Sequence, residues 1–283
     1  MQSNNCPLIT VAMVTYNSSR YLIEAIDSVL ASDYSNFELL ISDDCSLDNT
    51  WGIIKSYSDS RIIAVKQKKN IGEYNNRNYC LVSAKGKYII YIDGDDIIYP
   101  HSLSVFVNEL EASQECGMAI SRSVPNGIKN ILSPIETIKI HYLGDTVLNL
   151  ALVRVCFNRI KFLSLGGFSV KYKAGDDYAR LLMASHYPVK IVEDKLTWWR
   201  KSGNSASYKH FNSYSGVYEP LAIKYYFLNK TNLLSKKEML EIEKKLNVSY
   251  KNILKSLIKK GNFFWFIRYL FDYKTIKSLG LKV

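Results

Sequence analysis

Two short acidic runs stand out among the residues that could do chemistry. The pair Asp43-Asp44 follows one apolar run, and Asp93-Gly94-Asp95-Asp96 follows another. Five carboxylates that converge at one place repel one another unless a cation or hydrogen-bond donors compensate their charge. Oxygen ligands alone favour a hard ion such as Mg2+ or Mn2+, which bridges readily to phosphate. The acidic runs therefore predict a divalent metal ion and a phosphate-bearing ligand.

The elements around these runs are predicted to bring them to one edge of a sheet. Short apolar runs alternate with helical patterns, which is typical of βαβ units and an α/β fold with a mainly parallel sheet. Ligands of such sheets bind beyond the carboxyl ends of the strands, where Thr15-Tyr16-Asn17 would join the acidic runs. The predicted strands span residues 8–16, 37–42, 61–65 and 87–93. Three helices are predicted between them: one at 19–30, one that begins near residue 49, and one at 74–84.

The chain beyond Pro100 has a looser pattern and is predicted to complete the same domain. The expected elements are a helix at 102–111, a strand at 117–123, a loop at 123–134, a strand at 152–157, a Gly-Gly turn at 166–167, a helix at 177–185 and strands near residues 189 and 197. We predict one domain over 1–210, made of two parts at about 7–100 and about 101–210. A basic, amphipathic helical region is predicted over 211–283.

The placement of glycine, cysteine and histidine excludes several classes of site. No glycine precedes Gly52, so the first β-to-α turn is neither a dinucleotide-binding fingerprint nor a phosphate-binding P-loop. The five cysteines are spread singly, which indicates a reducing compartment, and the four histidines share no spacing of a ligand set. No signal peptide or membrane-spanning run is predicted, so we expect a cytoplasmic location.

The net charge of +11 belongs to the C-terminal region, because residues 1–210 carry +2 and residues 211–283 carry +9. This Lys-rich region is helical in pattern and ends in the aromatic cluster FFWFIRYLF. Two interpretations stay open: solvated helices whose aromatic side chains pack on the catalytic domain, or an amphipathic region that binds an anionic membrane surface. Nucleic acid is not expected as a partner, because no nucleic-acid-binding module accompanies the basic residues.

Over about residues 7–205 the chain resembles the inverting, GT-A-fold glycosyltransferases of family 2. Four segments carry the resemblance in order and spacing: PLITVAMVTYNSSRYLIEAIDSVL, ELLISDDCSLDNT, KNIGEYNNRN followed by AKGKYIIYIDGDD, and GGF followed by GDDYARLLMAS. The resemblance implies a Rossmann-like GT-A fold with a mainly parallel central sheet flanked by helices. It also implies transfer of a sugar from a nucleotide donor with inversion at the anomeric carbon.

The resemblance implies a catalytic domain over 1–210, with a nucleotide-binding half at about 7–100 and an acceptor-binding half at about 101–210. It implies a nucleotide site at the sheet edge. By the family pattern, Tyr16 stacks on the base, Thr15 and Asn17 shape its pocket, and Asp44 accepts a hydrogen bond from the uracil imide. A uridine (or thymidine) donor is favoured, because a purine offers no equivalent geometry. Arg77 matches a basic position of the pattern that could reach the donor phosphates.

The run Asp93-Gly94-Asp95 matches the D-x-D element of the family. By that match Asp95 ligates the metal ion, Mn2+ or Mg2+, and Asp93 contacts the ribose or a metal-bound water. Asp96 would lie near the donor sugar. The pair Asp176-Asp177 matches an acidic pair at a helix start, with Asp176 near the donor and Asp177 as the general base that deprotonates the acceptor hydroxyl.

Two positions depart from the family pattern. Cys45 stands where members commonly have Gly, and cysteine tolerates positive φ less well, so a different turn is expected there. Ser202 stands where many members have His. The diphosphate would then be held by Arg200 or Lys201.

These features predict a metal-dependent enzyme that moves a hexose or N-acetylhexosamine from a UDP-sugar to a hydroxyl of a saccharide acceptor. We expect a lipid-diphosphate-linked acceptor, a β-linkage, and a role in bacterial O-antigen or capsule synthesis at the inner face of the cell membrane. Two alternatives stay open: a non-catalytic nucleotide-binding or scaffold protein with this fold, and a nucleotidyltransferase. The second is disfavoured by the missing Gly-rich first loop.

Overall fold

The structure, a computed structural model, describes residues 6–123, 129–144, 146–192, 195–200 and 213–279. The chain divides into two units, and each draws on separated segments. The first unit comprises 1–133, 150–169 and 186–200. The second comprises 134–149, 170–185 and 201–283.

An eight-stranded mixed sheet organises the first unit, in the order β3-β2-β1-β4-β8-β6-β9-β7. The first four strands of the chain pair in parallel, as their nearly continuous apolar runs predict. They are β1 (Ile9–Thr15), β2 (Phe37–Asp43), β3 (Ile62–Lys66) and β4 (Tyr88–Asp93). The other half combines β6 (Met118–Ser121), β7 (Ile131–Leu132), β8 (Val155–Asn158) and β9 (Val189–Val192). There β8 runs antiparallel to β4 and β6, whereas β6 and β9 are parallel.

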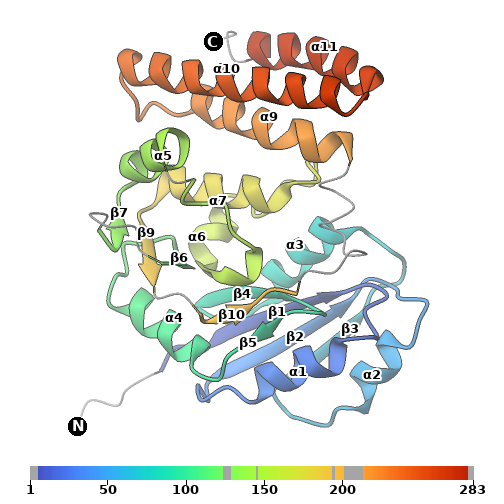
Figure 1. The fold of residues 1–283 in the computed structure, drawn as a ribbon. Helices are drawn as coiled ribbons and strands as arrows, with labels where there is room; N and C mark the ends of the chain where they lie inside the picture. Colours follow the sequence, from blue (N-terminus) through green and yellow to red (C-terminus); the bar gives the residue numbers. More distant parts are fainter. Residues whose placement is uncertain (1–5, 124–128, 145, 193–194, 201–212, 280–283) are drawn as a thin grey trace. The chain divides into compact units, whose positions relative to one another are not determined.

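Helices cover both faces of this sheet (Figure 1). One face carries α1 (Leu22–Leu30), α2 (Thr50–Ser56) and α4 (Ser102–Glu111), and the other carries α3 (Glu73–Ser83) and α6 (Arg159–Ser164). The alternating residues Ile9, Val11 and Met13 of β1 are fully buried in the core on the α1 side. A short two-stranded sheet pairs β5 (Ile97–Ile98) with β10 (Thr197–Trp198). This pairing ties the segment after β4 to the chain that precedes Arg200.

The second unit is helical. It contains α5 (Pro134–Leu143), α7 (Gly175–His186), α9 (Tyr214–Lys230), α10 (Lys236–Lys259) and α11 (Phe263–Leu279). The last three lie alongside one another (Figure 1). Ser235 begins α10 with a capping box to Glu238, which explains why this helix starts where it does. Among the described helices, none is both long enough and apolar enough to cross a bilayer.

Most predicted elements are confirmed, and the differences lie in the middle of the chain. The four N-terminal strands, the helices between them and the helical C-terminal region are present. The predicted loop at 123–134 contains β7 in its described part, and the predicted strand at 152–157 begins as a 3-10 turn over Leu152–Arg154 before β8. The helices α5 and α6 were not predicted. They are short and lack a strong apolar periodicity that sequence alone could reveal.

Candidate active site

The strand register confirms that polar residues converge at the carboxyl edge of the sheet. Thr15 at the end of β1 pairs with Asp43 of β2, and Val14 pairs with Asp93 of β4. Since β1 lies between β2 and β4, the turns that follow these three strands emerge side by side. This is the edge at which open α/β sheets bind ligands.

Short side chains tie the turn after β1 to the turn after β2. Ser46 Oγ accepts a hydrogen bond from the Asn17 N–H at 2.9 Å and donates to the Asp43 carboxylate. The same carboxylate accepts from Thr15 Oγ1 at 3.3 Å. Asn17 has φ 51°, a left-handed conformation that asparagine adopts more readily than most residues. Thr15 and Asn17 therefore fix the turn that leads into α1.

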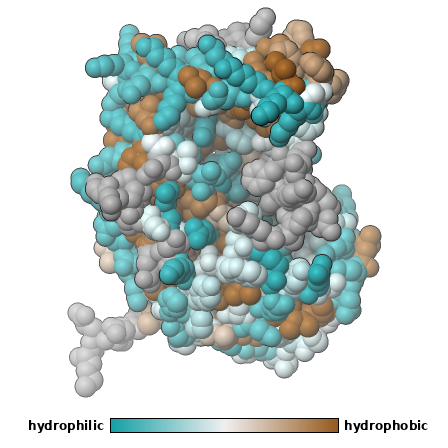
Figure 2. Space-filling view, viewed as in Figure 1, coloured by the Kyte–Doolittle hydropathy of each residue, from teal (hydrophilic) through white to brown (hydrophobic). Residues whose placement is uncertain are grey.

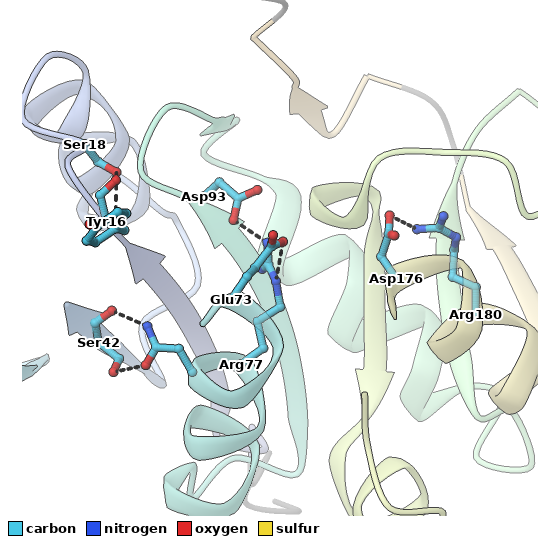
Figure 3. A network of polar contacts seen from close by, with 9 residues as sticks. Tyr16, Ser18, Ser42, Glu73, Arg77, Asp93, Asp176 and Arg180 are labelled. Atoms are coloured by element: carbon cyan, nitrogen blue, oxygen red, sulfur yellow. Dashed lines mark hydrogen bonds and ion pairs between the residues drawn. The ribbon is translucent and has the colours of Figure 1, made fainter. Parts of the chain in front are cut away.

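Tyr16 lies on that turn with 47% of its surface exposed. Its N–H donates to Ser18 Oγ at 3.3 Å, and Figure 3 shows the two residues close together. The ring is thus free of the core that buries most of β1. Its predicted stacking on a nucleotide base is compatible with this exposure and stays a prediction.

Asp44 is buried and anchors a second loop at the edge. Its Oδ1 accepts the Ile71 N–H at 2.7 Å, and its Oδ2 accepts the Gly72 N–H at 2.9 Å. Gly72 has φ 88°, a conformation that favours glycine. Each carboxylate oxygen can still accept another hydrogen bond, because an ionised carboxylate offers about four acceptor positions. Asp44 is therefore held in one orientation before any ligand arrives.

The buried Arg77 joins α3 to the acidic run after β4. Its Nη2 lies 2.7 Å from Asp93 Oδ1 and 2.9 Å from Glu73 Oε1, as Figure 3 shows. Its Nη1 is buried without a hydrogen-bond partner among the described residues. The nearby carboxylates outweigh burial and raise the pKa of Arg77 well above its ordinary value. The guanidinium thus orients Asp93, and its predicted contact with donor phosphates stays a prediction.

The turn after β4 is tight and rich in negative charge. The Asp96 N–H donates to the Asp93 carbonyl at 3.1 Å. A Cβ on Gly94 would lie 2.9 Å from Ser18 Cβ, so only glycine fits against the β1 turn. Burial, followed by the charges of Asp93 and Asp95, raises the pKa of Asp96 to about 8. Burial and Asp93 also raise the pKa of Asp95.

This donor set fits a divalent metal ion that is shared with a substrate. Burial and the charges of neighbouring carboxylates raise the pKa of Asp95 and of Asp96. A cation bound at this turn would therefore stabilise their ionised forms. The described part of the chain contains no group of three or more His, Cys, Asp or Glu side chains arranged to hold a metal. One or two carboxylates together with phosphate oxygens and water are the usual ligands of Mg2+ in such sites. Asp95 and Asp93 are therefore suitable as a partial ligand set that a diphosphate would complete.

Arg200 braces the acidic turn from the segment after β10. Its backbone N–H donates to Asp96 Oδ1 at 3.3 Å, and its Nε donates to the Asp95 carbonyl at 3.1 Å. Its Nη2 pairs with Glu24 at 2.7 Å, and its guanidinium lies 4.0 Å from the centre of the Tyr21 ring. These contacts commit much of the guanidinium within the protein. Lys201 and Ser202, the other predicted phosphate-site positions, lie outside the described residues.

The second unit carries the other predicted acidic pair. Asp176 and Asp177 lie in the first turn of α7, where the helix dipole favours negative charge. The buried Arg180 reaches both: its Nη1 lies 3.1 Å from Asp176 Oδ2, as Figure 3 shows, and its Nη2 lies 2.5 Å from Asp177 Oδ1. Burial raises the pKa of Asp177, and Asp176 adds to that effect, whereas Arg180 and Lys224 oppose it.

Sequence reasoning gave no role to four residues that complete these contacts: Glu24, Ser46, Glu73 and Arg180. Glu73 lies four positions before Arg77, and Arg180 lies four positions after Asp176. This spacing on a predicted helix is itself a signal of an ion pair. The Arg200–Glu24 pair joins residues 176 positions apart and left no local signal. The Ser46 bridge likewise depends on which strands are neighbours.

Comparison with known proteins identifies the sequence family. The pattern described as "Glycosyl transferase family 2" matches residues 10–166. Residues of this chain are 35% identical over 107 positions to the Escherichia coli UDP-Glc:alpha-D-GlcNAc-diphosphoundecaprenol beta-1,3-glucosyltransferase WfaP, covering 38% of this chain and 43% of that protein. An uncharacterized glycosyltransferase of Haemophilus influenzae is 26% identical over 253 residues, which cover 81% of this chain and 77% of that protein. The matched segment spans about two fifths of the length of WfaP and of two further curated relatives, EpsE of Bacillus subtilis and WcaA of Escherichia coli.

Comparison with solved structures supports the fold. The crystal structure of S. aureus TarS 1-349 in complex with UDP-GlcNAc superposes with a TM-score of 0.75 at 18% identity, covering 95% of this chain and 81% of that one. The mannosyltransferase PcManGT from Pyrobaculum calidifontis, solved with GDP-Man and Mn2+, gives a TM-score of 0.63 at 16% identity, covering 98% and 86%. The predicted GT-A fold is thereby confirmed. The two neighbours hold different nucleotides, so the fold alone does not select the base.

Proposed function

The chain belongs to glycosyl transferase family 2, and on that premise we propose that it transfers a hexose or N-acetylhexosamine from a UDP-sugar to a saccharide hydroxyl. The observation that carries the proposal is the convergence at one sheet edge of an exposed Tyr16, the fixed carboxylate of Asp44 and the acidic turn after β4. An aromatic ring, a hydrogen-bond acceptor and a metal-compatible turn are the groups that a nucleoside diphosphate needs.

The uridine preference rests on Asp44. Its two backbone hydrogen bonds hold the carboxylate in place and leave it able to accept another N–H. The uracil imide N–H is a donor of that kind. The names of WfaP and of the TarS complex, which cite UDP-Glc and UDP-GlcNAc, agree with a UDP-sugar.

The metal proposed here is Mn2+ or Mg2+, held by Asp95 and, directly or through water, by Asp93. When bound, such an ion neutralises charge that grows on the leaving diphosphate. Arg77 holds Asp93 in place, and Arg200 binds the backbone carbonyl of Asp95. Asp96 is proposed to lie near the donor sugar, and Arg200 and Lys201 near its phosphates.

Asp177 is proposed as the general base. Its carboxylate would take the proton from the acceptor hydroxyl while that oxygen attacks the anomeric carbon and the bond to the diphosphate breaks. Displacement from the opposite side turns an α-linked donor into a β-linked product. Burial raises the pKa of Asp177, which makes its carboxylate a better proton acceptor. Arg180 orients the carboxylate through Nη2, and Asp176 shares that arginine.

The acceptor is proposed to be a lipid-diphosphate-linked saccharide in bacterial surface polysaccharide synthesis. The printed name of WfaP specifies a diphosphoundecaprenol-linked GlcNAc acceptor, which supports this class. Such an acceptor places the reaction at the inner face of the cell membrane, the location expected from the sequence.

A donor panel tests the proposal. Purified protein with Mn2+ is incubated with UDP-, TDP- and GDP-sugars, and release of each nucleoside diphosphate is measured with and without saccharide acceptors. We expect release from UDP-sugars that accelerates with acceptor. Tight UDP binding without release would instead support the non-catalytic alternative. Formation of a sugar nucleotide from UTP and a sugar phosphate would support a nucleotidyltransferase.

A further inference from the structure

The outer face of α11 carries a stripe of exposed apolar side chains. Phe263, Phe264, Ile267 and Phe271 are 62%, 73%, 54% and 67% exposed. At about 100° per residue these positions fall within an arc of roughly 100° on the helix. Figure 2 shows hydrophobic surface at the upper right, where α10 and α11 meet in Figure 1, beside hydrophilic surface along α10. Contiguous apolar surface of this kind marks an interaction site.

The opposite face of α11 fixes the orientation of the stripe. Tyr269 is buried and stacks on Tyr250 of α10 with ring centres 5.3 Å apart. Trp265 meets Tyr214 of α9 edge to face at 6.0 Å, and Asp272 accepts a hydrogen bond from the Tyr214 hydroxyl at 2.5 Å. The helix is therefore seated by its inner face, and Phe263 and Phe264 lie on the outer, exposed face.

Positive charge surrounds the stripe. Residues 244–271 contain seven Lys and Arg and no Asp or Glu. Lys255, Lys259 and Lys260, in the last turns of α10 and the residue that follows, are exposed, as is the neighbouring Ile258. Exposed phenylalanines of one helix next to clustered lysines at the end of the helix before it are a combination found in segments that lie in a membrane interface.

We propose that the outer face of α11, together with the lysines at the end of α10, docks on the surface of an anionic bilayer. The aromatic side chains would enter the headgroup boundary, and the lysines would bind lipid phosphates. A second copy of the chain suits this face less well. A symmetric pair would bring two acid-free basic segments together, and like charges there repel each other. The inference does not depend on the transfer reaction.

Vesicle co-sedimentation of the full chain tests this surface. Vesicles of equimolar phosphatidylcholine and phosphatidylglycerol are compared with phosphatidylcholine alone, and binding is expected only to the first. The variant Phe264→Ser/Ile267→Ser is expected to lower the partition coefficient at least about tenfold. Lys259→Gln/Lys260→Gln is expected to lower it by a factor on the order of ten and to weaken its salt dependence.

Matched controls lie at the other end of α10. Leu240→Ser removes an equally exposed apolar side chain, and Lys236→Gln/Lys237→Gln removes the same charge from exposed positions of the same helix. Both controls are expected to bind vesicles as the parent chain does. The proposal would be overturned if control and test variants lost vesicle binding equally. It would also be overturned if the parent chain bound vesicles with and without phosphatidylglycerol equally well. A stable dimer by sedimentation equilibrium that dissociates in Phe264→Ser/Ile267→Ser, without any vesicle binding, would overturn it as well.

Discussion

The two acidic groups of the molecule are held in different ways. At the sheet edge, Asp44 is fixed by backbone N–H groups, and the turn after β4 gathers three carboxylates against one ion pair, Arg77 with Asp93. In α7, two carboxylates share one buried arginine. The first arrangement has more carboxylates than cations, which suits the proposed metal ion and diphosphate. In the second, Lys224 joins Arg180 near Asp177, so the two charges are more nearly equal, and Asp177 is the proposed general base.

The largest effect is expected from a substitution in α7 that lowers sugar transfer and leaves UDP binding at the sheet edge unchanged. Asp177→Asn should lower sugar transfer by about 10^2 to 10^4, because a positioned general base contributes that much to rate. UDP affinity, measured by calorimetry with Mn2+ present, should stay within error of the parent value. Near-normal turnover in Asp177→Asn would remove this residue from catalysis. Loss of UDP binding would instead mean that α7 belongs to the nucleotide site.

The second substitution tests nucleotide and metal binding at the sheet edge instead of proton transfer at α7. Asp95→Ala should lower metal-dependent UDP affinity by about a hundredfold or more, because even loss of a group that only orients a metal ligand costs about 10- to 100-fold. Calorimetry with Mn2+ and then with EDTA measures it, and the difference between the two conditions should vanish in the variant. Asp33→Ala, which removes a carboxylate from the loop before β2, is the control. An unchanged metal dependence in Asp95→Ala would refute the D-x-D assignment.

The balance of charge around Asp177 predicts opposite pH shifts. Asp177 must be ionised to accept a proton, so transfer is expected to fall as the pH drops through its raised pKa. Asp176→Asn removes a like charge and should move this acid limb to lower pH, whereas Arg180→Gln removes the compensating cation and should move it to higher pH. Shifts of up to about one pH unit are expected. Profiles of kcat/KM against pH measure both, and shifts in the same direction would contradict the assignment.

Much of the sheet edge was predictable from sequence, because the runs before Thr15, Asp43 and Asp93 are apolar, short and strand-like. Parallel strands then require their carboxyl ends to meet at one edge. The side chains that hold the site were harder to predict. The Arg77–Glu73 and Arg180–Asp176 pairs were visible as helical spacing and were overlooked, whereas the Arg200–Glu24 pair depends on packing between distant segments.

The grouping of segments into units is hard to read from sequence. Residues 134–149 and 170–185 group with the C-terminal helices, and the predicted domain boundary near residue 210 stays a prediction. Amphipathic periodicity tells which face of a helix is buried but not which partner buries it. Along the C-terminal region, the sequence left open whether the aromatic cluster packs on protein or meets a membrane. In the structure Tyr269 is buried and Phe264 is exposed, so the cluster divides by helix face.

The smallest effect is expected at Cys45, whose backbone conformation lies next to Asp44 at the sheet edge. Cys45 was expected to alter its turn, yet it adopts φ 62°, the left-handed conformation that favours glycine. This conformation costs a residue with a Cβ about 1–2 kcal/mol, and glycine gives back about 0.5–1 kcal/mol through its greater freedom in the unfolded chain. Cys45→Gly should therefore raise the free energy of unfolding by up to about 1 kcal/mol. Cys45→Ala keeps the strain and should gain nothing.

Urea unfolding of both variants measures this difference, with UDP affinity followed in parallel. If the backbone already holds Asp44 in its binding orientation, Cys45→Gly should stabilise the fold and leave UDP affinity unchanged, since Ile71 and Gly72 still donate to the carboxylate. A gain in stability accompanied by weaker UDP binding would show that the strained cysteine itself sets the orientation of Asp44. In that case the sheet edge would depend on a side chain in the same way that Asp177 depends on Arg180.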